Sequence, residues 1–296
     1  MQAFTLPEPL PVEKNLAAML SRGRPGQAEW SRFPSGEHFV HVSLSSTHAC
    51  VAGRSFPPGD NLLMTALLCD TLRRNGAQEI TLALPYFAYS RQDRQQLAGD
   101  PLSAGAIPTL LAAVGVKRIV TADIHSTLAL EASPIPIESV SMLPDFAAVL
   151  RPKLRPAPFT VVAPDHASRI RAEGLTALLG GVPIAWIEKE RTRFKGVTAR
   201  GRSGELAGTT AVLIDDMLDT GGTIEAAVRM LKKEGFKEFH LAITHPIFSK
   251  GAVPLLRKLG FSSVVVGNTM PISSEAKRLR GFTVVDAAPR LAEAMA

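Results

Sequence analysis

Residues 212–223 read VLIDDMLDTGGT, an order of residue types that predicts a strand, a turn and the start of a helix. The apolar run is typical of a buried strand, and we expect this strand to end at Asp215 and Asp216. The turn contains Gly221 and Gly222, which lack a Cβ and so let backbone N–H groups approach a ligand closely. In open α/β sheets, ligands bind beyond the carboxyl ends of the strands. The segment therefore predicts a binding loop at such an edge.

Two kinds of polar group follow the predicted strand. The helix should begin near Thr223, and the N–H groups of a helix N-terminus bind anions, to which the hydroxyls of Thr220 and Thr223 would add donors. The carboxylates of Asp215, Asp216 and Asp219 can accept hydrogen bonds from sugar hydroxyls or bind Mg²⁺. Amides for a phosphate and carboxylates for a diol match ribose 5-phosphate. The simpler interpretation, that Asp219 or Thr223 is only a helix cap, leaves the adjacent acids unexplained.

The rest of the chain alternates short β-branched segments with helical patterns. Strands are expected at residues 38–44, 79–86, 118–124, 160–165, 210–216, 239–245 and 263–268. Helices are expected at residues 61–76, 103–115 and 222–235, and Pro108 should kink the second of them or delay its start. This alternation implies an α/β fold with mainly parallel sheets flanked by helices.

The order of elements occurs twice, once on each side of the Pro-rich stretch 150–159, LRPKLRPAPF. The 296 residues are also enough for two domains. We therefore predict an N-terminal domain over residues 1–148 and a C-terminal domain over residues 149–296.

Composition excludes several classes of function. The net charge is +6, which favours acidic ligands, but the basic residues form no long run, so nucleic acid is not an expected partner. The two cysteines, Cys50 and Cys69, lie in no zinc or redox pattern. The N-terminus lacks a signal-peptide pattern, and the apolar segment 175–187 is interrupted by glycine and proline, so no membrane span is expected. These features predict a cytoplasmic protein.

Several segments resemble known families. DDMLDTGGT (215–223) resembles the phosphoribosyl-pyrophosphate-binding motif of the type I phosphoribosyltransferase fold. Further segments are similar, in the same order, to those of ribose-phosphate pyrophosphokinases: SRFPSGE (31–37), PYFAYSRQDRQ (85–95), VTADIHS (120–126), APDHASRIRA (163–172), WIEKER (186–191) and THPIFS (244–249). The resemblance implies two type I phosphoribosyltransferase-like domains, with ATP on the side of the first and ribose 5-phosphate on the side of the second.

The resemblance also implies the reaction. Such an enzyme transfers the diphosphoryl group of ATP to ribose 5-phosphate, giving phosphoribosyl pyrophosphate and AMP. Charge builds on phosphoryl oxygens in this transfer, so positioned cations are what catalysis needs. Lys189 and Arg191 are the candidates, because residues two apart in an extended segment project to the same side.

The remaining roles come from the resemblance alone. The implied ATP contacts are Phe33, Glu37, Arg91, Gln92 and His125. The implied ligands of Mg²⁺ are His125 and Asp165. The implied ribose 5-phosphate site is Asp215, Asp216, Asp219, Thr220, Gly221, Gly222 and Thr223. In that family the loop with Phe33 and Glu37 reaches a neighbouring subunit, which implies a homo-oligomer built from dimers, up to a tetramer or hexamer.

The chain also departs from the family pattern. Ser35 stands where the adenine loop has an acid, and His166, Ala167 and Ser168 replace x-Gly-Gly. Residues 91–106 lack an arginine-rich loop and resemble the short loop of archaeal-type enzymes, and residues 43–47, SLSST, lack the residues tied to regulation by phosphate and ADP. Two alternatives stay open: a phosphoribosyltransferase, and a catalytically silent homologue that regulates synthetases or senses nucleotides.

Overall fold

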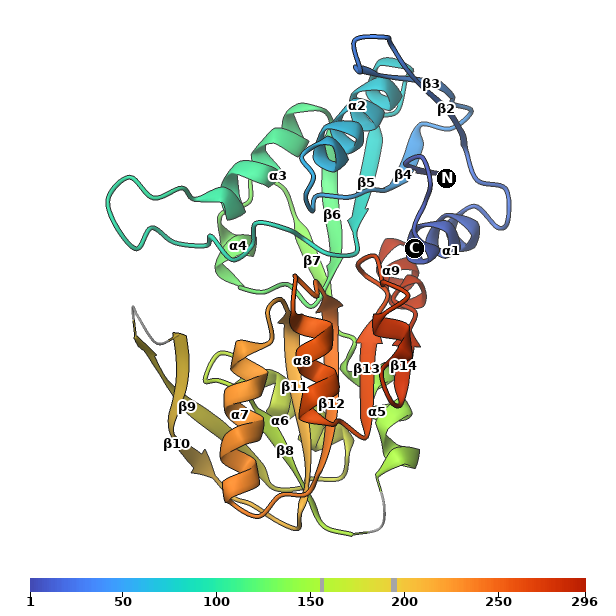
Figure 1. Ribbon diagram of the computed structural model, residues 1–296. Coiled ribbons are helices and arrows are strands. Elements are labelled where there is room, and N and C mark those ends of the chain that lie inside the picture. Colours follow the sequence, from blue (N-terminus) through green and yellow to red (C-terminus); the bar gives the residue numbers. More distant parts are fainter. Residues whose placement is uncertain (155–156, 193–195) are drawn as a thin grey trace. The chain divides into compact units, whose positions relative to one another are not determined.

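The computed structural model describes residues 1–154, 157–192 and 196–296, and the side chains of residues 189–200 lie outside this description (Figure 1). The chain forms two compact units. Unit 1 comprises Met1–Ser141 and Asp286–Ala296, and unit 2 comprises Met142–Val285. The division expected after residue 148 differs from this one, because it falls inside helix α5 (Leu143–Leu150) and leaves residues 286–296 in the second domain.

The sheet of unit 1 has five strands, all parallel. Its order is β1-β4-β5-β6-β7. The strands are β1 (Gln2–Thr5), β4 (His48–Ala52), β5 (Glu79–Leu84), β6 (Val116–Ala122) and β7 (Ile137–Val140). The three central strands are buried on both faces over most of their length, as parallel sheets are.

Helices cover both faces of this sheet. One face is packed by α2 (Asp60–Arg74), α3 (Ser103–Ala113) and α4 (Leu128–Glu131), whose apolar side chains share a core with the strands. The other face is covered by α1 (Pro11–Leu20) and α9 (Ala288–Met295) (Figure 1). Helix α3 begins at Ser103 and continues through Pro108, so the expected late start at the proline is wrong.

The segment predicted as a strand at 38–44 is a strand, but it does not join the parallel sheet. β2 (Gln27–Arg32) and β3 (His38–Ser43) form a separate antiparallel hairpin. Val40 and Val42 are buried while the residues between them are exposed. This alternation is typical of a hairpin that packs one face on a core and leaves the other in solvent.

Unit 2 contains a sheet of seven strands, in the order β10-β9-β8-β11-β12-β13-β14. The strands are β8 (Phe159–Ala163), β9 (Ile184–Thr192), β10 (Gly196–Gly204), β11 (Thr210–Leu218), β12 (Glu238–Pro246), β13 (Ser263–Gly267) and β14 (Phe282–Val285). All neighbours are parallel except β9 and β10, which form an antiparallel edge.

In the described part of unit 2, four α-helices flank the sheet. α7 (Gly222–Lys233) and α8 (Ala252–Leu259) lie on the face toward the viewer in Figure 1, where their apolar residues pack on the strands. α5 and α6 (Arg169–Leu178) pack together on the other face. Two short 3₁₀ helices, Arg151–Lys153 and Ala276–Arg278, complete the unit. The predicted fold class, parallel sheets flanked by helices, is confirmed.

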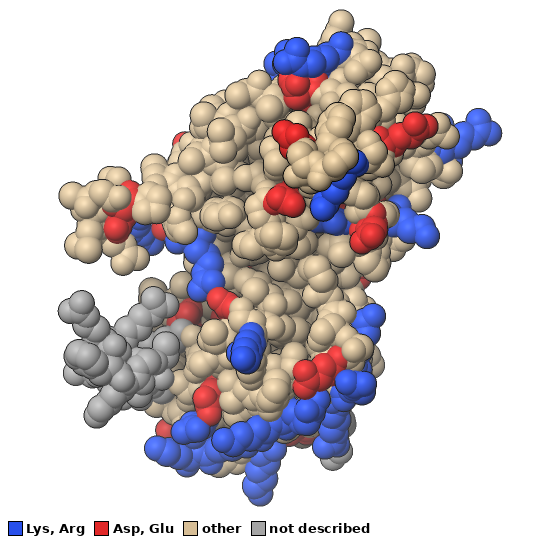
Figure 2. Space-filling view, turned by 45° about the horizontal axis from the view of Figure 1, so that its top comes forward, with Lys and Arg blue, Asp and Glu red and all other residues tan. Residues whose placement is uncertain are grey.

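The positive charge of the chain is distributed unevenly. Figure 2 shows Lys and Arg side chains gathered at the lower end of unit 2. Four basic residues also lie in the last turns of α7 and α8: Lys232, Lys233, Arg257 and Lys258. Cations at a helix C-terminus interact favourably with the helix dipole. Part of the excess of +6 therefore stabilises helix ends and does not by itself indicate an acidic ligand.

No helix among the described residues combines the length and the apolar character that crossing a bilayer requires.

Candidate active site

Strands β11 and β12 extend beyond their neighbours in the sheet. β8 pairs with β11 only as far as Leu213, whereas β11 and β12 stay paired until Leu218 and Pro246. The expectation that β11 ends at Asp215 and Asp216 is therefore wrong, because pairing with β12 carries the strand past them. Both aspartates lie inside the strand, with only 9% and 3% of their surface exposed.

A cluster of acids, two of them buried, includes Asp215. The hydroxyl of Ser168 lies 2.6 Å from Oδ1 of Asp215 and 2.8 Å from Oδ1 of Asp165. The backbone N–H of Asp216 donates to the same Asp215 oxygen at 3.0 Å. Nη2 of Arg171 lies 3.8 Å from Oδ2 of Asp216. The carboxyl ends of β8 and β11 thus bring three carboxylates together with one serine and one guanidinium.

The electrostatics of this cluster are unfavourable without a ligand. Burial raises the pKa of Asp215 well above its ordinary value, and the neighbouring carboxylates of Asp216 and Asp165 raise it further, against the opposing hydrogen bond from Ser168. Ser168 has one hydroxyl proton for two carboxylate oxygens. Hydrogen bonds from the hydroxyl groups of a ligand, or a bound divalent cation, would therefore stabilise the cluster.

The loop that follows β11 leads directly into α7. Gly221 has a φ of +82°, and a Cβ at this position would lie 3.1 Å from Cδ2 of Leu255, so glycine is required here. Gly221 is also the N-cap residue, and it has no side-chain cap. The simpler interpretation of Asp219 or Thr223 as the cap of this helix is not what the structure shows. The N–H groups of the first turn of α7 can bind an anion instead.

Asp219 is held in place by the segment after β12. The hydroxyl of Ser249 donates to Oδ1 of Asp219, and the backbone N–H of Ser249 donates to the Asp219 carbonyl at 3.1 Å. The neighbouring N–H of Phe248 donates to the carbonyl of Leu218 at 2.9 Å. Ser249 belongs to THPIFS, which the sequence analysis used only for its resemblance. From sequence alone, Ser249 is distinguished only as a hydroxyl residue that follows a predicted apolar strand.

The end of β6 in unit 1 carries the predicted residue His125. Asp123, two residues earlier, is buried and has a φ of +34°, and its N–H donates to the carbonyl of Val140 at 2.8 Å. The N–H of Ile124 donates to Oγ of Ser139 at 2.9 Å. The adjacent strand β7 therefore fixes the turn that presents His125, which is partly exposed.

The loop between β5 and α3 holds the other predicted ATP contacts of unit 1. Gln92 is tied to the start of α3, because its side chain accepts a hydrogen bond from Ser103 and its carbonyl accepts one from the N–H of Ala104 at 3.1 Å. The carboxylate of Asp100 accepts hydrogen bonds from two N–H groups of the same loop. Arg91 is exposed. The short loop is thus ordered by its own side chains.

The turn of the β2–β3 hairpin carries the predicted adenine-binding pair. The ring of Phe33 is 53% exposed and contacts Phe39 edge-on, with ring centroids 6.0 Å apart. Oε2 of Glu37 accepts a hydrogen bond from Oγ of Ser35 at 2.6 Å. Phe33 therefore leaves much of its ring exposed, and Ser35 orients the carboxylate of Glu37.

The predicted catalytic cations lie on β9, next to its antiparallel partner. Lys189 pairs with Ala199, and Arg191 pairs with Val197, so both have the extended backbone that the sequence predicted. The side chains of Lys189 and Arg191 lie outside the described residues.

Comparisons with known proteins agree with this architecture. The N-terminal domain of ribose phosphate pyrophosphokinase matches residues 4–115, and the phosphoribosyl transferase domain matches residues 146–258. A ribose-phosphate pyrophosphokinase of Pasteurella multocida is 34% identical over 274 residues, which are 91% of this chain and 87% of that protein. The chain belongs to the ribose-phosphate pyrophosphokinase family.

Other members of the ribose-phosphate pyrophosphokinase family are similarly related. A member from Mycobacterium tuberculosis is 38% identical over 88% of this chain and 81% of its own length. One from Methanopyrus kandleri is 32% identical over 90% of this chain and 89% of its own. The crystal structure of phosphoribosylpyrophosphate synthetase from Mycobacterium smegmatis has a TM-score of 0.87 and 30% identity, covering 99% of this chain and 97% of that one.

The fit of Mg²⁺, which the ribose-phosphate pyrophosphokinase family implies, can be tested on unit 2. Mg²⁺ prefers oxygen ligands and is usually bound through one or two carboxylates together with substrate phosphates. Among the described residues, no group of three or more His, Cys, Asp or Glu side chains is arranged to hold a metal ion alone. The carboxylates of Asp216 and Asp165, which raise the pKa of the buried Asp215, nevertheless fit a cation that arrives with its substrate.

The structure brings together only part of the predicted site. Within unit 2, Asp165 meets Asp215 through Ser168, and Asp216 lies near Arg171. Ser168 and Arg171 were not among the residues predicted for the site. Residues 219–223 follow the same strand. Within unit 1, Arg91, Gln92 and His125 lie in loops that follow β5 and β6.

Proposed function

We propose that the chain is a ribose-phosphate diphosphokinase, which transfers the diphosphoryl group of ATP to ribose 5-phosphate. The observation that carries the proposal is the loop of unit 2, where two buried carboxylates, Asp215 and Asp216, precede a glycine-capped helix N-terminus. Family membership supports it, since relatives that match over most of their length are named for this activity. We further propose that the enzyme is a cytoplasmic homo-oligomer.

Ribose 5-phosphate binds at the loop of unit 2 in this proposal. Its phosphate accepts hydrogen bonds from N–H groups of the first turn of α7, with Thr220 and Thr223 adding hydroxyl groups. Gly221 and Gly222 allow the close approach. The carboxylate of Asp219, which Ser249 orients, accepts a hydrogen bond from a ribose hydroxyl. Asp215 and Asp216 complete the set of acceptors.

ATP binds on the side of unit 1 in this proposal. Arg91, Gln92 and His125 contact the phosphates and ribose of the nucleotide, and the ring of Phe33 stacks on adenine while Glu37 accepts its amino proton. His125 of unit 1 and Asp165 of unit 2 are each proposed as a ligand of Mg²⁺, which when bound would neutralise charge at the phosphates. The functional division follows the predicted domains, 1–148 for ATP and 149–296 for ribose 5-phosphate.

In the transfer, the anomeric oxygen of ribose 5-phosphate attacks the β-phosphorus of ATP. The new bond joins this oxygen to the β-phosphorus, the bond from the β-phosphorus to the bridging oxygen of the α-phosphate breaks, and AMP leaves with the electron pair. The anomeric proton passes to solvent. Lys189 and Arg191 stabilise the charge on the transferring group.

The two alternatives account for less of the chain. A phosphoribosyltransferase has no need of a first domain with Arg91, Gln92 and His125. A silent homologue has no need of the complete loop 219–223 or of the buried acids. The decisive experiment incubates the purified protein with ATP, ribose 5-phosphate and Mg²⁺, and measures AMP and phosphoribosyl pyrophosphate. Equal amounts of both products support the proposal, and ADP or no product would refute it.

Changing Asp219 tests the assignment of the loop. We expect Asp219→Asn to raise the KM for ribose 5-phosphate about tenfold to a hundredfold, because a hydrogen bond to a charged group contributes about 1.5–3 kcal/mol. The KM for ATP should change by less than about twofold. Ser249→Ala, which removes only the orienting hydroxyl, should have a smaller effect of the same kind. Steady-state kinetics measure both constants, and an equal loss for both substrates contradicts the assignment.

Mixing two inactive variants tests whether the hairpin serves a neighbouring subunit. Phe33→Ala and Lys189→Ala, dissociated together and reassociated, should regain about a quarter of wild-type activity if a random pair of subunits forms each site. Each variant reassociated alone is the control. Mixed oligomers that stay inactive would place Phe33 in the ATP site of its own chain.

A further inference from the structure

A pocket of about 360 Å³ lies under the β2–β3 hairpin of unit 1, apart from the loops that follow β5 and β6. It is lined by the segments after β1 and β4, the hairpin and α2. The lining residues include Pro7, Glu8, Trp30, Arg32, Arg54 and Met64. Its volume is within the range of pockets that bind small molecules. The proposed reaction gives it no role.

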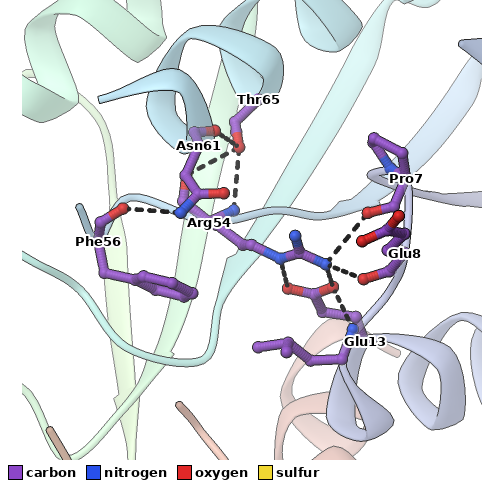
Figure 3. A network of polar contacts seen from close by, with 8 residues as sticks. Pro7, Glu8, Glu13, Arg54, Phe56, Asn61 and Thr65 are labelled. Carbon is purple, nitrogen blue, oxygen red and sulfur yellow. Dashed lines mark hydrogen bonds and ion pairs between the residues drawn. The ribbon is translucent and has the colours of Figure 1, made fainter. Parts of the chain in front are cut away.

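Arg54 is the most constrained of these residues, with only 9% of its surface exposed (Figure 3). Its Nε donates to Oε1 of Glu13 at 2.7 Å, and its Nη2 donates to Oε2 of Glu13 at 2.6 Å and to the carbonyl of Glu8 at 2.7 Å. Its backbone N–H donates to Oγ1 of Thr65 at 2.9 Å. The guanidinium is therefore fixed before any ligand arrives.

The third nitrogen of this guanidinium, Nη1, is on the side away from Glu13 (Figure 3). No atom of the described residues accepts its hydrogen bonds. Trp30, which lines the same pocket, has a buried indole Nε1 that also has no partner among the described atoms. A buried donor without a partner, such as Nε1 of Trp30, is rare in proteins. Nε1 of Trp30 and Nη1 of Arg54 are both donors, so a ligand that matches them must present acceptors.

Charge narrows the class of ligand. The carboxylate of Glu13, itself fully buried, neutralises Arg54 from behind, and the exposed Glu8 adds another negative charge at the rim. Arg32, 4.0 Å from Asp60 and 61% exposed, is the other cation of the lining. A phosphate dianion is disfavoured by this balance, whereas a single carboxylate can pair with the open side of Arg54. The ring of Trp30 and the side chain of Met64 provide an apolar wall.

We propose that this pocket binds a small monocarboxylate, whose carboxylate accepts hydrogen bonds from Nη1 of Arg54 and whose apolar body lies against Trp30 and Met64. The lining contains none of the residues proposed to bind ATP or ribose 5-phosphate, although Arg32 adjoins Phe33 on the hairpin, so its ligand is an additional one. A preorganised guanidinium loses little freedom on binding, which favours a measurable affinity for a small ligand.

Trp30 makes the test direct, because the chain has two tryptophans and Trp186→Phe leaves Trp30 as the only one. Benzoate should change the fluorescence of this variant with saturation and a dissociation constant on the order of 1 mM or below. Acetate, which lacks the apolar body, and benzyl alcohol, which lacks the carboxylate, should bind at least about tenfold more weakly. Inorganic phosphate should not compete. The assay needs no turnover, so its failure leaves the proposed reaction untouched.

Variants separate the pocket from unspecific binding. Glu13→Leu combined with Arg54→Met removes both members of the buried pair, so no uncompensated buried charge remains. This double variant should abolish saturable binding. Ser31→Leu, at an exposed position of the lining, fills the pocket without touching the pair and should weaken binding at least tenfold. Arg24→Ala, an exposed arginine outside the lining, is the control. Unsaturable benzoate binding, competition by phosphate, or unchanged affinity in Ser31→Leu would each overturn the proposal.

Discussion

Replacing Lys189 with alanine is expected to lower kcat about a thousandfold, while the KM values for ATP and ribose 5-phosphate change less than about threefold. A cation that interacts mainly with the transferring diphosphoryl group stabilises the transition state more than either bound substrate. Cations in comparable positions of phosphoryl-transfer enzymes contribute about 10³–10⁵ to the rate. Steady-state kinetics with each substrate varied in turn give the three constants.

A matched control separates this effect from a general loss of positive charge. Lys233 lies exposed in the last turn of α7, and Lys233→Ala should keep kcat within about twofold of the wild type. Lys189→Arg should retain more activity than Lys189→Ala, because it keeps a cation on β9. If Lys189→Ala turned over at the wild-type rate, Lys189 would have no part in the transfer.

The second large effect is a gain in stability together with a loss of activity. Asp215→Asn keeps an oxygen that can accept the hydrogen bonds from Ser168 and the N–H of Asp216. It removes the negative charge that Asp216 and Asp165 repel. We expect the free energy of unfolding at pH 8 to rise by about 1–3 kcal/mol, the usual cost of an unsatisfied buried group. Ribose 5-phosphate turnover should fall at least about a hundredfold.

The pH dependence gives this prediction its sign. The pKa of Asp215 is raised in the folded protein, mainly by burial, so between the unfolded and the folded pKa the folded state holds a proton that the unfolded state has released. Stability therefore falls as pH rises through the folded pKa of Asp215. The advantage of Asp215→Asn should be absent at acidic pH and should grow toward alkaline pH.

Urea unfolding at several pH values measures this dependence. Glu173→Gln, which changes an exposed acid of α6, is the control and should show no such gain. A variant with Asp215→Asn that is less stable than the wild type at pH 8 would mean that the charge of Asp215 is already compensated.

The fold was predictable where strands are long and rich in β-branched residues. β5, β11, β12 and β13 were all expected from their apolar runs. β1, β7 and β14 have only four residues each, too few for a period to be recognised. β9 and β10 contain many polar residues, and their pairing with each other, rather than an apolar pattern, defines them as strands. Local sequence carries little information about such pairing.

The candidate site was predictable where its residues are contiguous. Residues 215–223 form one strand end, one loop and one helix start, so the sequence presents them together. Ser168 and Arg171 come from the start of α6, and Ser249 comes from the segment after β12. Their contacts depend on strands of the sheet being neighbours, which a single sequence does not state. Hydroxyl groups at such positions have no distinctive pattern of their own.

The association of α9 with unit 1 has a consequence for how the chain folds as it is synthesised. Nη2 of Arg118 donates to the carbonyl of Ala294 at 2.7 Å, and Nδ2 of Asn15 donates to Asp286 at 2.7 Å, so residues 286–296 complete a layer that began with α1. All of unit 2 leaves the ribosome before these residues do. Unit 2 can therefore fold while the apolar side of α1 still lacks its partner, and this side is the surface that a chaperone would have to shield in the nascent chain.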